Sequence, residues 1–297
     1  MDAKTIFITG ASGFLGGAVI RRLSVAKSRR AVCLSRRPLQ IASSNISTVT
    51  GDLLDKQGYS KHISGCDMVL HLAAVTGKSA PREYFKVNRD ATAVLAEEAA
   101  GHGVEKFIFV SSIAAKFNDP RYQYGQSKLQ AEEKIKQTTL NWTIVRPTMI
   151  LGKGSPVEQS LTKLATLPLM PVFGDGKVRV QPIFVDDLAE CLVEMLDDTS
   201  VTAQTIEVGG PEVVTLEELI RLIGRKSGGR SAPVIHLPIG PISACLRLAE
   251  PLLRPMLPFT AGQLASFCHD GVAEPDAWVA ARQPRMKLLK EMLDATA

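Results

Sequence analysis

A glycine-rich turn near the N-terminus constrains the fold of this chain more than any other stretch. Residues 9–16 read Thr-Gly-Ala-Ser-Gly-Phe-Leu-Gly and follow directly on the apolar run Ile6–Ile8. A buried strand that turns through glycines into a helix is how α/β proteins receive the pyrophosphate of a dinucleotide. We expect Gly10 to permit the tight turn, Gly13 to let backbone N–H groups approach phosphate, and Gly16 to let the helix pack on the strand. The residues expected to contact such a cofactor are Gly10, Ser12, Gly13, Phe14, Leu15 and Gly16.

The spacing of these glycines is G-x-x-G-x-x-G rather than the more familiar G-x-G-x-x-G, so the turn alone is a weak signal. A glycine turn that binds nothing is the alternative. The strand before the turn, and the apolar pattern of Ala18, Val19 and Leu23 after it, favour a dinucleotide site.

Apolar runs alternate with helical patterns through the first half of the chain. The runs are rich in Val, Ile and Leu without a regular polar alternation, which is typical of strands buried on both faces of a parallel sheet. This order predicts an α/β fold with a doubly wound parallel sheet of the Rossmann type. The expected strands are Thr5–Thr9, Ala31–Ser35, Ser47–Thr50, Met68–Ala73, Phe107–Ser111 and Thr143–Arg146. The expected helices are Gly13–Ala26, Glu83–His102 and Tyr124–Gln137.

The rhythm of the sequence changes after about residue 150. A helix is expected over Val185–Leu196 and a strand over Thr205–Val208. Thr215–Glu218 reads Thr-Leu-Glu-Glu, the pattern of a helix N-cap with a capping box. We therefore expect a dinucleotide-binding domain over residues 1–150. Residues 151–297 are expected to form a smaller C-terminal region that covers the substrate and is partly interleaved with the last strands of the sheet.

Composition and charge argue against several classes of function. The net charge of +5 is spread over 297 residues with only 5% aromatics, so the basic stripe with interleaved aromatics that is typical of nucleic-acid binding is missing. The five cysteines are widely spaced and odd in number, so neither a disulfide framework nor a metal site is expected. A strand begins within the first residues and no leader peptide precedes it, so a cytoplasmic location is expected.

The late stretch Ile235–Phe267 is strongly apolar but contains Arg247, Glu250, Arg254 and several prolines. These residues predict that it is not a transmembrane segment. We expect it to be domain core, and the alternative is that it walls a pocket for a hydrophobic carbonyl or alcohol.

The end of the second strand distinguishes NAD from NADP in such folds, because an acidic residue there holds the ribose 2′-hydroxyl of NAD. This chain has Ser35-Arg36-Arg37 instead, and Arg36 offers a charged fork suited to a 2′-phosphate. NADP(H) is therefore the predicted cofactor and NAD(H) the alternative. The simpler explanation of the two arginines is that both are solvated on the surface and bind nothing. Asp52, next to Leu53 in the predicted site, can reach the adenine amino group, unless it caps the next helix.

Tyr124-Gly-Gln-Ser-Lys128 opens an expected helix, and its i, i+4 spacing places Tyr124 and Lys128 on one face. A nearby ammonium would lower the pKa of the tyrosine, which could then exchange a proton with a carbinol or carbonyl oxygen. Lys128 can also reach the ribose hydroxyls of a nicotinamide nucleotide. The preceding strand ends in Ser111 and Ser112 at the edge where open α/β sheets bind ligands, so one of these serines could hydrogen-bond the reacting oxygen.

These motifs make the chain similar to the extended, epimerase/dehydratase-like branch of the short-chain dehydrogenase/reductase superfamily. The resemblance implies that the catalytic serine is Ser112 rather than Ser111. The other catalytic residues that it implies are Tyr124 and Lys128. The matching segments run almost the full length of the chain and are residues 9–16, Gly51-Asp52, His71–Ala74, Val87-Asn88, Val110–Ser112, Tyr124 with Lys128, Arg146–Thr148 and Phe184–Ala189.

The resemblance also extends the predicted cofactor site. Ala73 and Ala74 match a segment that runs beside the cofactor, and Pro147 and Thr148 match residues that line the nicotinamide pocket. A homodimer is the expectation at the level of the family.

The second half of the chain is most similar to an atypical group typified by the nucleotide-binding accessory subunit of respiratory complex I. That subunit is thought to bind NADPH without turnover. The similar segments are residues 174–187, 257–264 and 269–272. The present chain keeps the serine, tyrosine and lysine, so the resemblance does not imply inactivity.

One position departs from the family pattern. Nucleotide-sugar epimerases and dehydratases usually carry an arginine that grips the substrate diphosphate, shortly before the segment that matches Phe184–Asp187 here. The equivalent position is Val180, with Arg179 beside it. Neighbouring residues of a strand point to opposite faces, so we expect Arg179 to point away from the site unless a bulge intervenes.

These features predict an NADP(H)-dependent oxidoreductase that moves a hydride between a nicotinamide and a carbon bearing an oxygen, with Tyr124 as the acid/base. Its partner would be a small-molecule substrate, whose identity the sequence does not reveal. Two alternatives stay open. One is a nucleotide-sugar epimerase or dehydratase with tightly bound NAD(P). The other is a non-catalytic NADPH-binding assembly or sensor protein.

Overall fold

The computed structural model describes residues 3–26, 29–41, 43–226, 232–253, 256–257 and 259–295. Its centre is a sheet of seven parallel strands in the order β11-β6-β5-β4-β1-β2-β3. The predicted α/β fold is confirmed, and the six strands predicted in the first half begin and end close to the expected residues. The strands of this sheet are β1 Thr5–Thr9, β2 Arg30–Ser35, β3 Ile46–Thr50, β4 Met68–His71, β5 Lys106–Val110, β6 Trp142–Pro147 and β11 Gln204–Val208.

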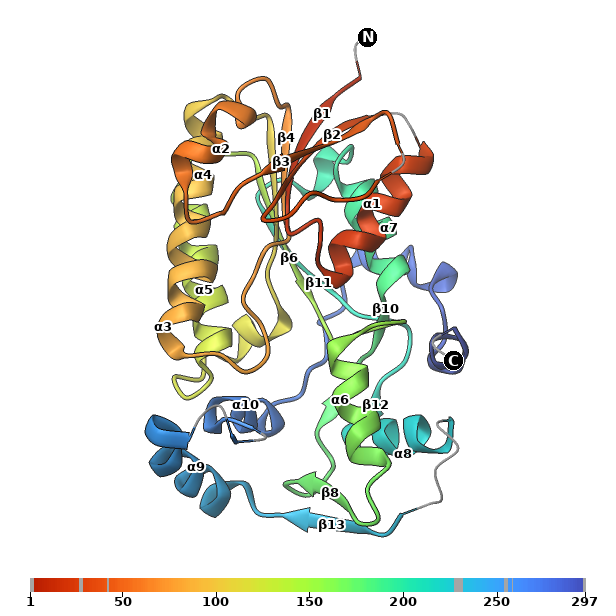
Figure 1. The fold of residues 1–297 in the computed structure, drawn as a ribbon. Helices are drawn as coiled ribbons and strands as arrows, with labels where there is room; N and C mark the ends of the chain where they lie inside the picture. The colour runs from red at the N-terminus through yellow and green to blue at the C-terminus, as the bar shows by residue number, and fades with distance from the viewer. Residues whose placement is uncertain are drawn as a thin grey trace.

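Alternate side chains of each central strand enter two different cores. On β1, Ile6 and Ile8 pack in the cluster formed with α1 and α7, whereas Phe7 packs in the cluster formed with α2, α4 and α5. Figure 1 shows these two helical layers on opposite faces of the sheet. Burial on both faces explains why the strand sequences lack polar alternation. The helices are α1 Phe14–Ala26, α2 Lys56–Ile63, α4 Thr92–Gly101, α5 Gln123–Lys136 and α7 Val185–Met195.

The chain reverses its direction across the sheet between β1 and β4. It builds from β1 to β2 and β3 at one edge, then returns to β4 and builds through β5 and β6 to β11 at the other. Open α/β sheets bind their ligands outside the carboxyl ends of the strands at such a switch point. The glycine turn follows β1, so it lies at this position.

Two helical segments differ from the prediction. The helix expected over Glu83–His102 is instead α3 Pro81–Tyr84, a π-helical segment η1 Phe85–Ala91, and then α4. Helix α2 was not predicted, because only Tyr59 and Ile63 of its residues are buried and the rest of its sequence is largely polar. A short amphipathic helix of this kind gives a weak periodic signal.

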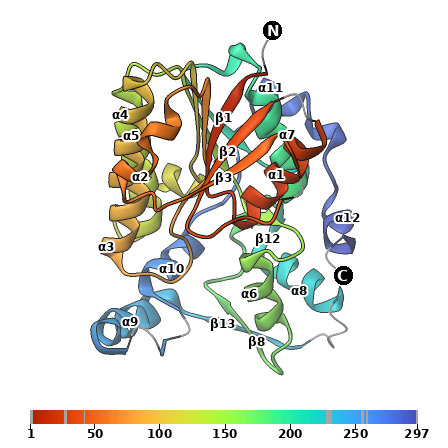
Figure 2. The same cartoon turned by 45° about the horizontal axis from the view of Figure 1, so that its top comes forward.

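After β6 the chain forms a smaller lobe at the carboxyl ends of the strands, apart from α7 and β11, which belong to the main sheet and its helical layer, and the C-terminal segment (Figures 1 and 2). A third apolar cluster lies between its helices α6 and α8. The predicted capping box is confirmed, since Glu218 N donates to Thr215 Oγ1 at 3.2 Å and Thr215 N donates to the Glu218 carboxylate at 2.8 Å. The elements of the lobe are β7 Ile150–Leu151, α6 Pro156–Ala165, β8 Met170–Phe173, β9 Arg179–Val180, β10 Ile183–Phe184, β12 Val214–Thr215, α8 Leu216–Lys226, β13 Val234–Leu237, α9 Ile239–Leu253 and α10 Ala261–Ala265.

The chain leaves this lobe after residue 268 and runs back along the edge strand β11. Ala273 N donates to Gln181 Oε1 and Glu274 N donates to Glu207 Oε2, both at 2.9 Å. Among the described residues β11 pairs only with β6, and the hydrogen bond of Glu274 with the Glu207 side chain anchors the C-terminal segment to this edge strand.

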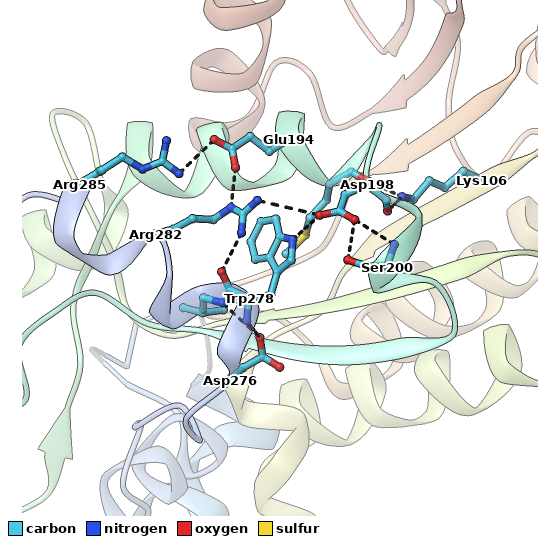
Figure 3. Close-up of polar contacts among 10 residues, drawn as sticks. Lys106, Glu194, Asp198, Ser200, Asp276, Trp278, Arg282 and Arg285 are labelled. Carbon is cyan, nitrogen blue, oxygen red and sulfur yellow. Dashed lines mark hydrogen bonds and ion pairs between the residues drawn. The ribbon is translucent and has the colours of Figure 1, made fainter.

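The C-terminal segment is fixed by a polar cluster at the far end of α7 (Figure 3). Trp278, in α11 Ala277–Ala280, donates its indole N–H to Asp198 Oδ2 at 2.7 Å. The Arg282 guanidinium lies 3.4 Å from the centre of the Trp278 ring, and its Nε donates to Glu194 Oε2 at 2.5 Å. Lys106 Nζ donates to the carbonyl oxygen of Asp198 at 2.5 Å, where a cation is favoured by the nearby helix end.

The apolar stretch Ile235–Phe267 is only partly core, so the expectation for it is partly wrong. Leu264 in α10 is fully buried, whereas Leu248 and Leu252 in α9 are 83% and 86% exposed. In the part of the chain that the structure describes, no helix is long and apolar enough to cross a membrane.

Candidate functional site

The glycine turn is as tight as the sequence predicts. Gly10 has φ +75°, and a Cβ there would lie 2.5 Å from Ala73 N; a Cβ at Gly16 would lie 2.1 Å from Gly10 O. Only glycine fits either position, so the predicted roles of Gly10 in the turn and Gly16 in the helix–strand contact are confirmed. The N–H of Gly13 donates to Gly10 O at 2.9 Å. The approach of Gly13 to phosphate stays a prediction, as do cofactor contacts of the other turn residues.

A buried histidine joins the ends of β1 and β4. His71 is fully buried, with Nδ1 2.5 Å from Thr9 Oγ1 and Nε2 2.8 Å from Thr92 Oγ1 in α4. Burial lowers the pKa of His71 to about 3, so the ring is neutral. Ala73 N donates to the same Thr9 hydroxyl at 3.3 Å. The predicted cofactor segment of Ala73 and Ala74 is thereby held over the glycine turn.

The end of β2 presents two exposed cations. Arg36 and Arg37 are exposed, and within the described part of the chain neither guanidinium has a hydrogen-bond or ion-pair partner. Ser35 is buried and its carbonyl accepts a hydrogen bond from Gly51 N at 3.0 Å. Since β2 pairs with β1 through Leu34 and Thr9, the arginines follow at the same sheet edge as the glycine turn.

The segment after β3 shows that Asp52 does not cap the next helix, α2. Its Oδ1 accepts a hydrogen bond from Leu54 N at 2.9 Å, so it stabilises a local turn. The residue that caps α2 is Asp55, whose carboxylate accepts from Gly58 N. Leu53 is half-buried and packs on the core beneath α2. The predicted contacts of Asp52 with adenine and of Leu53 with the cofactor stay predictions.

The two serines at the end of β5 have different partners. Ser112 caps the 3₁₀ helix η2 Ile113–Phe117, where its Oγ accepts a hydrogen bond from Ala114 N at 3.2 Å, and its proximity to Tyr124 tends to lower the pKa of the phenol. Ser111 instead donates to Glu132 Oε1 at 2.5 Å in the protein interior. A Cβ at Gly125 would lie 2.6 Å from Ala114 O, so this glycine permits the close approach of α5 to η2. The structure therefore brings together Ser112 and Tyr124, and it directs Ser111 elsewhere.

Lys128 is almost completely buried and lies under the sheet edge. Its Nζ donates to Val110 O at 2.7 Å and lies 4.1 Å from the centre of the Phe109 ring. Burial lowers the pKa of Lys128 to about 7, and Glu132 opposes this effect. Burial raises the pKa of Tyr124, and Lys128 is not among the groups that shift it. The expected lowering of the Tyr124 pKa by Lys128 is therefore wrong for this structure.

A buried ion network, which the sequence reasoning missed, supports this arrangement. Glu132 is fully buried and accepts two hydrogen bonds from Arg146, at 2.7 and 3.0 Å, besides that from Ser111. Arg146 also pairs with Glu207 at 3.4 Å, and Glu207 pairs with Lys116 at 3.0 Å. Buried charges need such paired and hydrogen-bonded surroundings. The one available signal was that Glu132 follows the predicted lysine by one helical turn.

The π-helical segment η1 places another unassigned polar residue beside α5. Asn88 is fully buried; its amide donates to Val75 O at 3.0 Å and to Ser127 Oγ at 3.1 Å, and its Oδ1 accepts from Val75 N at 2.7 Å. Ser127 Oγ in turn donates to Tyr124 O at 2.7 Å. Asn88 thus joins the segment after β4 to the helix that carries Tyr124. π-helical turns are frequent at functional sites.

Aromatic rings flank Tyr124. The rings of Tyr84 and Tyr122 have their centres 6.1 and 5.9 Å from that of Tyr124, and Phe117 stacks on Tyr122 at 6.5 Å. His269, from the C-terminal segment, stacks on Phe117 at 4.7 Å. The surroundings of the tyrosine are therefore apolar, which is consistent with the raised pKa of its phenol.

His269 is held by a hydrogen bond with Asp119. Its Nε2 lies 2.9 Å from Asp119 Oδ2, and Asp119 also accepts three side-chain hydrogen bonds from Arg121 at 2.7 to 3.2 Å. The hydrogen bonds from Arg121 and His269 lower the pKa of Asp119. No sequence pattern linked residues so far apart in the chain.

The predicted contact Thr148 follows Pro147 at the end of β6 and is buried. Its N donates to Val208 O at 3.0 Å, and its hydroxyl donates to Gln181 O. The hydroxyl is already engaged by backbone, so a contact of Thr148 with a nicotinamide stays a prediction.

Residues 6–209 match the family described as the NAD dependent epimerase/dehydratase family. The chain belongs to this family. It is 32% identical over 197 residues to the ceramide reductase of Caulobacter vibrioides, covering 65% of this chain and 61% of that protein, so it spans less than two thirds of that relative. The crystal structure of gox2253 superposes with a TM-score of 0.76 over 99% of this chain and 97% of that one, at 24% identity.

The chain is also similar to a subunit of complex I. The chain is 26% identical over 291 residues to the 40 kDa subunit of the mitochondrial NADH-ubiquinone oxidoreductase of Neurospora crassa, covering 93% of this chain and 74% of that protein. This similarity supports a distant relationship to such subunits. The identity to this subunit is lower than the identity to the ceramide reductase, so the comparisons do not assign the chain to the complex I branch.

The arginine position that is expected in nucleotide-sugar members of the family is occupied here by an apolar side chain. Val180 is buried in the apolar cluster of the lobe. Arg179 points the other way and pairs with Asp270 at 2.7 Å, while its backbone N donates to the same carboxylate at 2.9 Å. The expected orientation of Arg179 is confirmed, and no bulge turns it inward.

Proposed function

We propose that the chain is an NADP(H)-dependent oxidoreductase that interconverts a carbonyl and an alcohol, with Tyr124 as the acid/base. The observation that carries the proposal is that Ser112 lies near enough to Tyr124, at the carboxyl end of β5, to act on the pKa of its phenol. It places a hydroxyl and a phenol together at the sheet edge where this fold binds ligands.

The surroundings of Tyr124 favour its acid role. Because burial raises its pKa, the phenol is protonated at neutral pH and can donate its proton to a carbonyl oxygen. Ser112 orients that oxygen through its own hydroxyl. Lys128, Asn88 and the buried Glu132 keep α5 in place, and Lys128 can turn from Val110 O toward the ribose of a bound nucleotide.

The residues present suit a dinucleotide with a 2′-phosphate. A side chain at Gly10 or Gly16 would close the turn. Arg36 lies at the end of β2, where an acidic residue would select NAD, and its guanidinium has no partner among the described residues. In the proposed site the turn holds the pyrophosphate and Arg36 the 2′-phosphate. When bound, the nicotinamide supplies or accepts the hydride.

A substrate without a nucleotide diphosphate is favoured. Arg179 is committed to Asp270 outside the site, and rings of Tyr84 and Tyr122 flank Tyr124. The similarity to a relative named ceramide reductase supports an apolar carbonyl compound. The family match also supports epimerase or dehydratase chemistry as the competing function.

Consumption of the nucleotide separates the two functions. The purified protein is incubated with NADPH and a panel of carbonyls that includes long-chain ketones and a nucleotide-sugar, and absorbance of the reduced nicotinamide is followed. We expect net oxidation of NADPH with an apolar ketone. Tightly retained nucleotide with product formation but no net oxidation would contradict the proposal and support an epimerase or dehydratase.

A further inference from the structure

Helix α9 packs with one side on its neighbours and exposes large apolar side chains on the other. On the packed side, the Glu250 carboxylate accepts a hydrogen bond from Ala261 N of α10 at 2.5 Å, and Ile239 lies against Gly174. On the outer side, Leu248 and Leu252 are 83% and 86% exposed. These two leucines are therefore available for a contact outside the chain.

The exposed apolar side chains form one stripe. Those on α9 recur at three- or four-residue spacing, so they share one face of the helix, and Met256 N donates to Leu253 O at 2.9 Å just beyond its end. No carboxylate belongs to the set, and a contiguous apolar patch of this kind marks an interaction surface. The outer stripe consists of Pro241, Cys245, Leu248, Leu252 and Met256.

Cations flank the outer stripe. Arg247 is exposed beside Leu248, and Lys78 Nζ donates to Leu257 O at 2.7 Å, which places an ammonium at the end of the stripe. Arg82 on α3 is 88% exposed but pairs with Glu83 at 3.6 Å, so Arg247 and Lys78 are the cations that bear on the stripe. The one acidic residue of α9, Glu250, is directed toward α10 instead.

We propose that the outer stripe docks on the surface of an anionic phospholipid membrane. An apolar face with cations at its border is what such a surface binds. The 15 residues of α9 span about 22 Å, too short for a bilayer core of about 30 Å, so the helix lies in the plane of the interface. A second copy of the chain suits the stripe less well, because pairing two such faces brings their cations together without a carboxylate on either stripe.

Docking would turn the small lobe toward the lipid. In both views α9 lies at an outer edge of that lobe, next to β13, at the end of the molecule to which the strands point (Figures 1 and 2). The proposal concerns this surface only and does not depend on the proposed reaction.

Flotation with vesicles tests the docking. The full chain is mixed with vesicles of phosphatidylcholine containing phosphatidylglycerol, or of phosphatidylcholine alone. We expect the wild type to float with the anionic vesicles, and the double variant Leu248→Glu/Leu252→Glu to bind them at least about tenfold more weakly. Arg247→Ala should weaken binding to anionic vesicles severalfold and leave the weaker binding to phosphatidylcholine unchanged. Val25→Glu is the matched control, because Val25 is also 83% exposed but lies on α1.

Failure of the wild type to float, or equal flotation of the double variant, would overturn the proposal. Sedimentation velocity tests whether a second copy of the chain covers the stripe instead. A dimeric wild type together with a monomeric double variant would assign the stripe to a second copy and overturn the proposal. The substituted side chains are exposed, so an unchanged thermal midpoint verifies that the variants fold.

Discussion

At the scale of the residue, two adjacent glycines of α1 meet different surroundings. A Cβ at Gly16 would lie 2.1 Å from Gly10 O, whereas at Gly17 the nearest atom would be the flexible end of Arg21 at 3.8 Å. We expect Gly16→Ala to destabilise the protein by at least about 2 kcal/mol, because backbone must move. Gly17→Ala, the matched control, should be stabilising by about 0.5–1 kcal/mol, since alanine favours a helix. Denaturant unfolding measures both, and equal effects of the two substitutions would contradict the observed close approach.

Burial of Lys128 makes stability depend on pH in a defined direction. Its pKa falls from an ordinary 10.5 to about 7 on folding, so between these values the unfolded chain binds a proton that the folded chain does not. The free energy of unfolding therefore rises with pH in this window. Relative to Lys128→Met, the wild type should gain about 1.4 kcal/mol per pH unit between about pH 7.5 and 9.5. Denaturant unfolding across this range measures the difference, and parallel profiles would show that the ammonium keeps its ordinary pKa.

At the scale of the element, the sequence predicts strands better than helices. The strands around β1 are apolar on both faces, so their bounds are visible locally. Helix α2 was not predicted because few of its side chains are buried. The π-helical turn η1 was not predicted because an apolar pattern does not reveal one inserted residue. The exposure of α9 could not be predicted either, because an apolar sequence reads as core when its neighbours are unknown.

The C-terminal segment gives a prediction at this scale. Trp278→Phe keeps the ring beneath Arg282 but removes the hydrogen bond to Asp198. A hydrogen bond to a charged group contributes about 1.5–3 kcal/mol, so we expect the variant to lose about that much stability locally. Limited proteolysis should cleave residues 269–288 faster than in the wild type, whereas Trp142→Phe, in β6, should leave that rate unchanged. Equal cleavage of all three proteins would show that the cluster does not hold the segment.

At the scale of the whole molecule, the candidate site is assembled from distant parts of the chain. Motifs at the ends of β1, β2 and β5 could be placed from the sequence, because the order of strands in a doubly wound sheet brings those ends together. The partners Glu132 with Arg146 and His269 with Asp119 could not, since their pairing depends on how α5 and the C-terminal segment pack. Sequence patterns therefore predicted which strand ends meet at the candidate site, but not the charged residues that surround it.

The order of strands also places Arg36 beside the glycine turn, which predicts a preference for NADPH. Arg36→Ala should raise the Kd for NADPH at least about tenfold, a loss of about 1.4 kcal/mol, and leave the Kd for NADH nearly unchanged. Arg37→Ala is the neighbouring control and should have a smaller effect. Fluorescence titration measures each Kd, and equal losses for the two nucleotides would show that Arg36 does not contact a 2′-phosphate.

The central claim is that Tyr124 donates the proton in an NADPH-dependent reduction, and the turnover of Tyr124→Phe tests it most directly. With the best ketone from the panel and saturating NADPH, we predict that kcat falls at least about 100-fold while the Kd for NADPH stays the same. Tyr59→Phe, which alters a buried phenol remote from the site, should retain wild-type turnover. Full turnover by Tyr124→Phe would contradict the account.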